Sequence, residues 1–291
     1  MNHRNPFHNS KIARLKPSIR IITLPGEALR PAHMLSRLAN IWSSSGCRVS
    51  IGPCDQLDAA IGIVHVDRTV VPGNILPELP NNRVLLNQKI LDISKRLISD
   101  QLIKSKHNDW PGSVIIKTDA NYYGGIERGE LRPWDIRRIR RRISGFIPWK
   151  LMREPPHNDY PVLPSVRDVP DWVWTRQDLI VERFLPERHG DEYALRMWIF
   201  MGDQEYSARI FSRHPIVKAT RMTHYEYLDE VPPLLREIRQ RLGIDFGKFD
   251  YVMIDGNPVL LDVNKTPTIA IGNTSAGSRL ACLANGLDHY L

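Results

Sequence analysis

Three oxygen-bearing side chains gather at one end of a predicted hairpin. Residues 249–267 hold two apolar, β-branched runs on either side of an Asp-Gly-Asn-Pro turn, a pattern typical of a β-hairpin. Asp262 and Asn264 lie two apart on the second strand, so their side chains leave the same face. With a turn of about three residues, Asp250 pairs across the ladder with Asp262 or with a position one away.

Such a cluster of oxygen ligands favours Mg²⁺, which usually takes one or two carboxylates and fills its shell with phosphate oxygens. The alternative is a solvated hairpin end that is polar without a ligand. We favour the metal site because the strand Leu-Leu-Asp-Val-Asn has the pattern of a buried strand. Its carboxylate would otherwise be unpaired, at a cost of several kcal/mol.

Two lysines are candidates for binding phosphate. Lys117 ends the apolar strand 113–117 and is followed by Gly124 and Gly125. A cation beside a flexible glycine loop can grip phosphate, with loop N–H groups as further donors. Lys95 is expected on the preceding helix and has the same interpretation. A solubilising role is the alternative for both lysines.

A third set of polar residues lies in and after the apolar strand 181–186, which passes into a loop at Pro186. The backbone that leaves this strand offers N–H and C=O groups to a planar base, and Glu182 can accept from an exocyclic amine. Glu192 is a candidate acceptor for ribose hydroxyls. Arg196 and Arg209 lie on the next two strands, where cations would offset phosphate charge. Solvent-facing charge is the alternative for each of them.

Composition excludes several classes of protein. The chain has 291 residues, 42% of them hydrophobic and 25% charged, which argues against wholesale disorder. No apolar run approaches the roughly 18 residues needed to cross a bilayer. The segment from Met1 to Lys16 lacks the apolar centre of a secretory signal. The three sparse cysteines have no CxxC spacing, so we expect neither a disulfide frame nor a zinc site. We therefore predict a cytoplasmic location without a membrane partner.

The net charge of +8 favours anionic partners. Much of the excess lies in 132–150, where five arginines crowd together, and the ordinary interpretation of such a run is a solvated helical face. Nucleic acid is disfavoured as a partner because few aromatic residues that could stack bases lie there. We hypothesise that the longer Arg-, Trp- and Pro-rich segment 132–176 caps the site and helps to select its substrate.

The elements that position these residues follow from periodicity and from Pro and Gly breaks. Strand–helix–strand order in the first part predicts a small α/β unit of parallel strands. The second half is dominated by strands and predicts an α+β unit with an antiparallel sheet. Expected strands are 18–24, 47–51, 60–65, 82–86, 113–117, 179–185, 193–201 and 205–211, and expected helices are 31–44, 90–103, 234–242 and 278–283.

In their order along the chain, these features resemble the ATP-grasp superfamily, over most of the chain from residue 18 to the last helix. The strongest part is 249–252 together with 261–267, which is similar to the metal-binding end of D-alanine–D-alanine ligases and glutathione-synthetase-like ligases. The strand 114–117 with its glycine loop and the segment 181–185 come next. The spacing between Asp92 and Lys95 differs slightly from the usual pattern.

The resemblance implies an ATP-grasp fold of mixed α/β and α+β class. It would consist of a mobile arm at 1–16, an N-terminal parallel α/β domain at 17–87, a central lid at 88–180 and a C-terminal antiparallel α+β unit at 181–291. ATP would lie between the last two units. Possible assemblies include a homodimer.

The resemblance also implies a role for each candidate residue. Lys95 and Lys117, with the loop of Gly124 and Gly125, would hold phosphates; Glu182, Arg183, Phe184, Leu185 and Glu192 would contact adenosine; Asp250, Asp262 and Asn264 would hold Mg²⁺, with Mn²⁺ as an alternative; Arg196 and Arg209 would face the transferred group. Many ligases carry Glu where this chain has Asp262. Asp also occurs there in ATP-grasp-like inositol phosphate kinases, so this departure leaves the reaction class more open.

The leading expectation is an ATP- and Mg²⁺-dependent ligase that joins a small-molecule carboxylate to an amine through an acyl phosphate. Lysines, arginines and metal ligands suit such positioning chemistry, and no Ser-His-Asp or Cys-His pattern is present. The alternatives are a small-molecule kinase, which the arginine-dense segment would favour, and a nucleotide-binding module without turnover.

Overall fold

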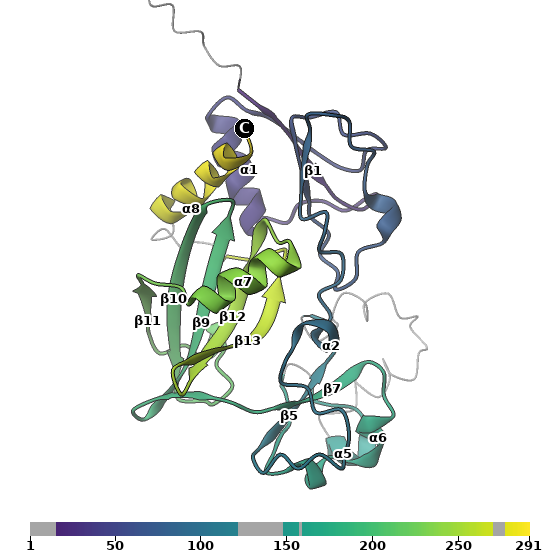
Figure 1. The fold of residues 1–291 in the computed structure, drawn as a ribbon, viewed down its shortest axis with the longest axis vertical. Helices are drawn as coiled ribbons and strands as arrows, with labels where there is room; N and C mark the ends of the chain where they lie inside the picture. Colours follow the sequence, from purple (N-terminus) through teal and green to yellow (C-terminus); the bar gives the residue numbers. More distant parts are fainter. Residues whose placement is uncertain (1–15, 122–147, 157–158, 270–276) are drawn as a thin grey trace, which may run out of the picture.

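The computed structural model describes residues 16–121, 148–156, 159–269 and 277–291. Nearly all of the predicted N-terminal arm, the loop of Gly124 and Gly125, and most of the arginine-rich segment lie outside the described residues. Three sheets form the framework of the described part (Figure 1). None of its helices is both long enough and apolar enough to cross a membrane.

The first sheet is parallel, as the strand–helix–strand order predicts. Its strand order is β2-β1-β3-β4, with parallel pairing throughout. Helix α1 buries Leu35, Leu38 and Trp42, whose helical spacing forms one apolar stripe. The elements are β1 (Ser18–Ile22), α1 (Met34–Ser44), β2 (Arg48–Ile51), β3 (Ile61–Val64), the 3₁₀ helix η1 (Gly73–Ile75) and β4 (Val84–Leu86).

The second sheet is small and antiparallel, with the order β6-β5-β7. Its apolar side chains pack with tryptophans of the short helices to form a separate core. The elements are β5 (Val114–Thr118), α5 (Trp149–Met152), β6 (Val162–Leu163), η3 (Val166–Asp168), α6 (Asp171–Trp174) and β7 (Leu179–Arg183).

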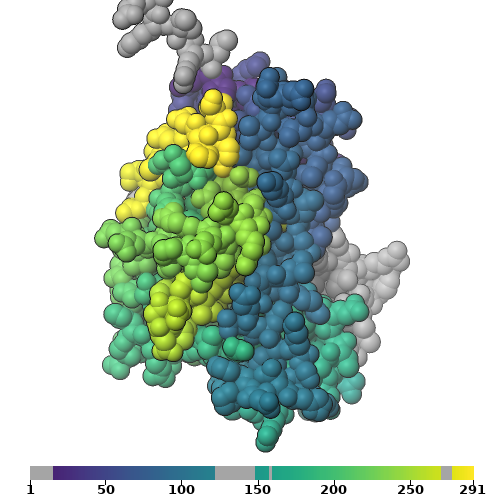
Figure 2. All heavy atoms as spheres, in the orientation of Figure 1, coloured from purple at the N-terminus to yellow at the C-terminus, as the bar shows by residue number. Residues whose placement is uncertain are grey.

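The third sheet is antiparallel and has the order β11-β10-β9-β12-β13, with β8 paired to β9. Helix α7 begins with Pro233 and ends at Gly243, whose φ of 64° suits a left-handed C-cap. Figures 1 and 2 show α7 in front of this sheet. The elements are β8 (Glu187–His189), β9 (Glu192–Met201), β10 (Gln204–Ser212), η4 (Ala219–Arg221), β11 (Tyr225–Leu228), α7 (Pro233–Leu242), β12 (Phe246–Ile254), β13 (Asn257–Asn264), α8 (Gly277–Ala284) and η6 (Asn285–Tyr290).

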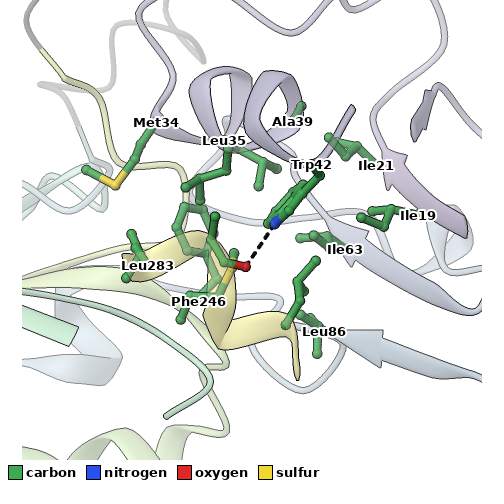
Figure 3. Packing of buried hydrophobic residues seen from close by; sticks show 14 of the residues in the cluster. Ile19, Ile21, Met34, Leu35, Ala39, Trp42, Ile63, Leu86, Phe246 and Leu283 are labelled. Atoms are coloured by element: carbon green, nitrogen blue, oxygen red, sulfur yellow. Dashed lines mark hydrogen bonds between the residues drawn. The ribbon is translucent and has the colours of Figure 1, made fainter. Parts of the chain in front are cut away.

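The largest core joins the first sheet to the last helix. Leu35 and Trp42 of α1 pack in one cluster with Phe246 of β12 and Leu283 of α8 (Figure 3). The indole N–H of Trp42 donates a hydrogen bond of 2.9 Å to the carbonyl of Ala284. The N-terminal unit therefore shares its interior with the third sheet and α8.

The predicted helix at 90–103 is wrong for most of its length, because only α2 (Lys95–Ile98) is helical there. Its apolar residues have helical spacing but enter two cores: Ile90 and Ile93 pack beside α7, and Ile103 packs against the second sheet. The backbone is held by non-helical bonds such as Ile93 N–H to Thr69 O. This segment is a connector between the first two sheets.

The other predicted strands and helices in the described residues are present, with ends shifted by a few residues. Strands β6, β8 and β11, which have two to four residues, were not predicted. The division into domains at 17–87, 88–180 and 181–291 stays a prediction.

Candidate active site

Asp250 and Asp262 form a cross-strand pair in the β12–β13 ladder, as predicted from the sequence. The turn itself has two residues, Asp255 and Gly256, both with positive φ, as a type I′ hairpin requires. The ladder shifts register between Asp250 and Tyr251, so that Tyr251 pairs with Leu260. This β-bulge brings the two carboxylates to one face of the sheet.

Each of the two carboxylates has one buried oxygen that accepts no hydrogen bond. Asp250 Oδ1 and Asp262 Oδ1 are buried atoms that accept no hydrogen bond from any described residue. Burial raises the pKa of Asp250; the charge of Lys248 opposes this rise, and that of Asp262 adds to it. Two close carboxylates with unused oxygens are the arrangement that a divalent cation relieves.

Asn264 extends this set of oxygens on the same face. Its Oδ1 accepts the backbone N–H of Thr266 at 2.8 Å and lies 3.4 Å from the hydroxyl of the same residue. No three His, Cys, Asp or Glu side chains in the described residues are grouped to hold a metal alone. Two carboxylates and one amide instead suit Mg²⁺ that completes its shell with phosphate oxygens and water.

Two lysines lie against the carboxylates. Lys95 Nζ is 3.4 Å from Asp262 Oδ1 and donates to Asn121 Oδ1 at 2.9 Å. Lys95 lies on the short helix α2 and is only 4% exposed, with its side chain directed at the hairpin. Lys248 Nζ donates to Asp250 Oδ2 at 2.8 Å. Lys248 was not singled out in the sequence, yet it lies two residues before Asp250 and so shares its face.

Lys117 and Glu182 face each other on the second sheet. Lys117 Nζ lies 2.7 Å from Glu182 Oε2, and the glutamate is 2% exposed. They belong to the paired strands β5 and β7. The other Glu182 oxygen, Oε1, is buried and accepts no hydrogen bond from the described residues.

A cavity connects the second and third sheets and brings seven of the candidate residues together. Lys95 and Lys117 line it with the carboxylates Asp250 and Asp262. The remaining walls are mainly apolar, and they include the segment Arg183, Phe184, Leu185 and Pro186, together with Leu195 and Ile216. An elongated ligand with one apolar end and one anionic end fits this division of the walls.

Solved structures of known proteins share this arrangement of three sheets. A RiPP-associated ATP-grasp ligase of Chryseobacterium gregarium, solved with ADP and a leader and core peptide, superposes with a TM-score of 0.52 at 10% identity; 94% of this chain and 97% of that chain are covered. The ATP-grasp ligase PsnB, solved with a minimal precursor, has a TM-score of 0.52 at 10% identity, over 94% of this chain and 99% of that chain.

The chain has the ATP-grasp fold. The macrocyclase MdnC of Microcystis aeruginosa MRC, bound to its precursor peptide MdnA, also superposes, with a TM-score of 0.51 at 10% identity over 91% of this chain and 97% of that chain. No protein-family model matches the chain, and no curated protein matches it by sequence. The predicted fold class is thus confirmed from structure at identities of 10%.

The two predicted catalytic arginines lie on the other face of the third sheet of this ATP-grasp fold. Arg196 pairs with Tyr251, the neighbour of Asp250, and Arg209 pairs with Arg196, so all three side chains alternate away from the carboxylates. Arg196 donates to Glu187 at 2.7 Å, and Arg209 donates to Glu226 at 2.8 Å. The prediction that they face the transferred group has no support in this geometry.

Glu192 also lies away from the cavity. Its Oε1 accepts the hydroxyl of Thr223 at 2.7 Å, and His224 Nδ1 is 3.7 Å from Oε2. The described walls of the cavity do not include Glu192. Its predicted contact with ribose therefore stays a prediction.

A second cavity adjoins the first and extends the ATP-grasp site toward the parallel sheet. It is lined by Asp250, Asp262 and Asn264 and also by Asp67 and Asn121. The Asn121 side chain links the α2 segment to β13, because it accepts a hydrogen bond from Lys95 and donates one of 3.0 Å to Val263 O. Neither Asp67 nor Asn121 stands out in the sequence, since both lie in irregular segments without a periodic neighbour.

Proposed function

We propose that the chain is an ATP- and Mg²⁺-dependent ligase that joins a carboxylate to an amine through an acyl phosphate. The observation that carries the proposal is the pairing of Asp250 with Asp262 in a cavity that also holds Lys95 and Lys117. The neighbour PsnB has been solved with Mg and ADP, with a TM-score of 0.52. That structure supports the proposal through its fold.

The apolar end of the cavity is the proposed adenine site. The N–H groups of Arg183 and Phe184 already donate to Gln101 O and Ser113 O, each at 2.9 Å. Carbonyl oxygens and the Leu185 N–H are therefore the backbone groups that we assign to the base. Glu182, with its unpartnered Oε1, is the proposed acceptor for an exocyclic amine.

The phosphates are proposed to lie at the polar end, between Lys117, Lys95 and Lys248. Together these three cations can offset the charge of a triphosphate and of the transferring group. Asp250, Asp262 and Asn264 fit Mg²⁺ by their donor types, and Oδ1 of each aspartate accepts no hydrogen bond from the described residues. Bound there, the cation would act as a Lewis acid and a template.

The reaction needs little covalent chemistry from the protein. A substrate carboxylate oxygen attacks the γ-phosphorus of ATP, which gives an acyl phosphate and ADP. An amine nitrogen then attacks the acyl carbon, and phosphate leaves with the electrons of the broken C–O bond. Positioning of the reactants and stabilisation of the charge are the contributions that we assign to the chain.

Trapping with hydroxylamine tests this function. Purified protein is incubated with ATP, MgCl₂ or MnCl₂, hydroxylamine and a panel of amino acids and dicarboxylic acids. We expect a hydroxamate and ADP with at least one acid, because an acyl phosphate reacts with hydroxylamine. A phosphoester from a parallel panel of alcohols, without any hydroxamate, would identify a kinase. Tight ATP binding without turnover in either panel would contradict both reactions.

A further inference from the structure

One carboxylate in the second cavity lies outside the proposed metal set. Among the described residues that line this cavity, the acidic side chains are Asp67, Asp250 and Asp262. The last two belong to the hairpin. Asp67 comes instead from the loop after β3.

Asp67 lies where open α/β sheets commonly bind ligands. In the order β2-β1-β3-β4, the chain leaves β1 toward one edge and β3 toward the other. Ligands bind outside the carboxyl ends of the strands at such a switch point. Asp67 follows the carboxyl end of β3, beside β1, and its side chain remains 31% exposed.

The Asp67 carboxylate is held on both of its oxygens. Oδ1 accepts the hydroxyl of Thr266 at 2.9 Å, and Oδ2 lies 3.5 Å from His33 Nε2. Behind His33, its Nδ1 lies 3.0 Å from Nε2 of His65. Both imidazoles are buried, with exposed fractions of 4% and 3%.

The hydrogen-bond network assigns the tautomers of the two imidazoles. His65 Nδ1 is buried and has no hydrogen-bond partner among the described residues. A buried lone pair without a hydrogen bond costs less free energy than a buried N–H without one. His65 therefore donates from Nε2 to His33 Nδ1, and His33 directs its Nε2–H at Asp67. Burial lowers the pKa of His65 to about 3, so its ring is neutral at physiological pH.

His33 and Thr266 orient the Asp67 carboxylate, one at each oxygen. Arg30 Nη1 lies 3.6 Å from Asp67 Oδ2, but the Arg30 side chain is 61% exposed and its attraction is screened by water. The carboxylate thus presents a fixed negative charge to a cavity shared with the hairpin carboxylates. A cationic nitrogen is the ligand chemistry that this arrangement recognises.

We propose that Asp67, positioned by His33 and Thr266, binds the acceptor amine as its ammonium form and takes up one of its protons before the C–N bond forms. This inference rests on the proposed ligase function. Loss of that proton to Asp67 frees the lone pair on nitrogen. The nitrogen then attacks the carbonyl carbon of the acyl phosphate, the C–O bond to phosphate breaks, and phosphate leaves with the electron pair. The second proton that nitrogen loses goes to the leaving phosphate.

Hydroxylamine separates this role from activation of the acid, because it is largely uncharged at neutral pH and needs no base. The experiment compares wild type and Asp67→Asn in two assays: hydroxamate formation, and amide formation with a panel of primary amines. We expect Asp67→Asn to keep hydroxamate formation within about threefold and to lose amide formation by about 100-fold or more, the usual contribution of a general base. Asp58→Asn is the matched control, since Asp58 is paired with Arg20 away from the cavity.

Hydroxamate formation by Asp67→Asn also shows that the variant is folded. Amide formation close to wild type, or equal loss in both assays, would overturn the role of Asp67 while leaving the ligase function intact. Absence of hydroxamate in the wild type would overturn the ligase function and this inference with it. In a second variant, His33→Ala, we expect the KM for the amine to rise about tenfold, with recovery in His33→Gln, which retains an N–H donor. An unchanged KM would contradict the positioning role.

Discussion

Asp262 lies opposite Asp250 because Leu261 is an extra residue in its strand. The two-residue turn sets Tyr251 opposite Leu260, and a regular ladder would continue with Leu261 opposite Asp250. Asp262 would then turn toward the face that packs on α7. A single bulge therefore decides whether the two carboxylates meet.

The first prediction concerns this pair. Asp262→Asn keeps the size of the side chain but removes one of two carboxylates, so we expect turnover to fall at least about 100-fold, as for loss of electrostatic stabilisation at a reacting group. Asp255→Asn on the same hairpin is the control, because Asn suits its positive φ of 49°. Phosphate release and Mg²⁺-dependent binding of ATP by calorimetry are the measurements. Wild-type turnover in Asp262→Asn would remove the metal assignment.

A second prediction follows from the buried Lys117–Glu182 pair. Lys117→Met leaves a buried carboxylate without its cation, so we expect the free energy of unfolding to fall by about 3–5 kcal/mol. The double variant Lys117→Met/Glu182→Leu should recover most of this loss, because no buried charge then remains. Denaturant unfolding of the single and double variants measures the coupling. Additive losses would contradict it.

The third prediction separates stability from ATP use on the opposite face of the sheet. Arg196→Met leaves Glu187, a buried residue, without its main cation, and we expect a loss of about 3 kcal/mol in the free energy of unfolding. The KM for ATP should stay unchanged, because Arg196 is on the face away from the carboxylates. Exposed Arg188→Met is the control and should change stability by less than about 0.5 kcal/mol. A large rise in KM for Arg196→Met would restore the direct role predicted from the sequence.

The fourth prediction is a pH dependence of stability that arises from His65. Its folded-state pKa is about 3, below the usual histidine pKa of 6.5, so the unfolded chain binds a proton that the folded chain does not. The contribution of His65 to stability is therefore complete above pH 6.5 and is lost as the pH falls toward 3. Between pH 6.5 and pH 5 we expect the free energy of unfolding to fall by about 2 kcal/mol.

Urea unfolding at several pH values measures this loss. Replacement of the imidazole by a group that does not titrate, His65→Gln, should flatten the profile between pH 6.5 and pH 5 by that amount. Equal slopes in wild type and His65→Gln would show that other groups cause the pH dependence.

The hairpin could be predicted from the sequence because its signals are local. An Asp-Gly turn between apolar runs gives the hairpin, and period-2 spacing gives the shared face of Asp262 and Asn264. The predicted three-residue turn was wrong, but the bulge supplies the same one-residue shift, and so the expected pairing is confirmed.

The side of the sheet on which Arg196 lies could not be predicted in the same way. Strand β9 is covered on both faces, so its hydrophobic alternation is weak, and the face of each residue depends on its register with β12. Asp67 and His33 are brought together only by the tertiary fold. His33 precedes α1, between β1 and β2, and Asp67 follows β3. No spacing in the sequence reports such a meeting.

The bond from the Trp42 indole to Ala284 has a consequence for biosynthesis. The two residues are 242 positions apart, so at about 5–20 residues per second α1 leaves the ribosome roughly 12 to 48 s before its partner helix exists. During that interval the stripe of Leu35, Leu38 and Trp42 has no native cover from α8. Nascent chains of this protein should accordingly depend on chaperones until translation has passed Leu283.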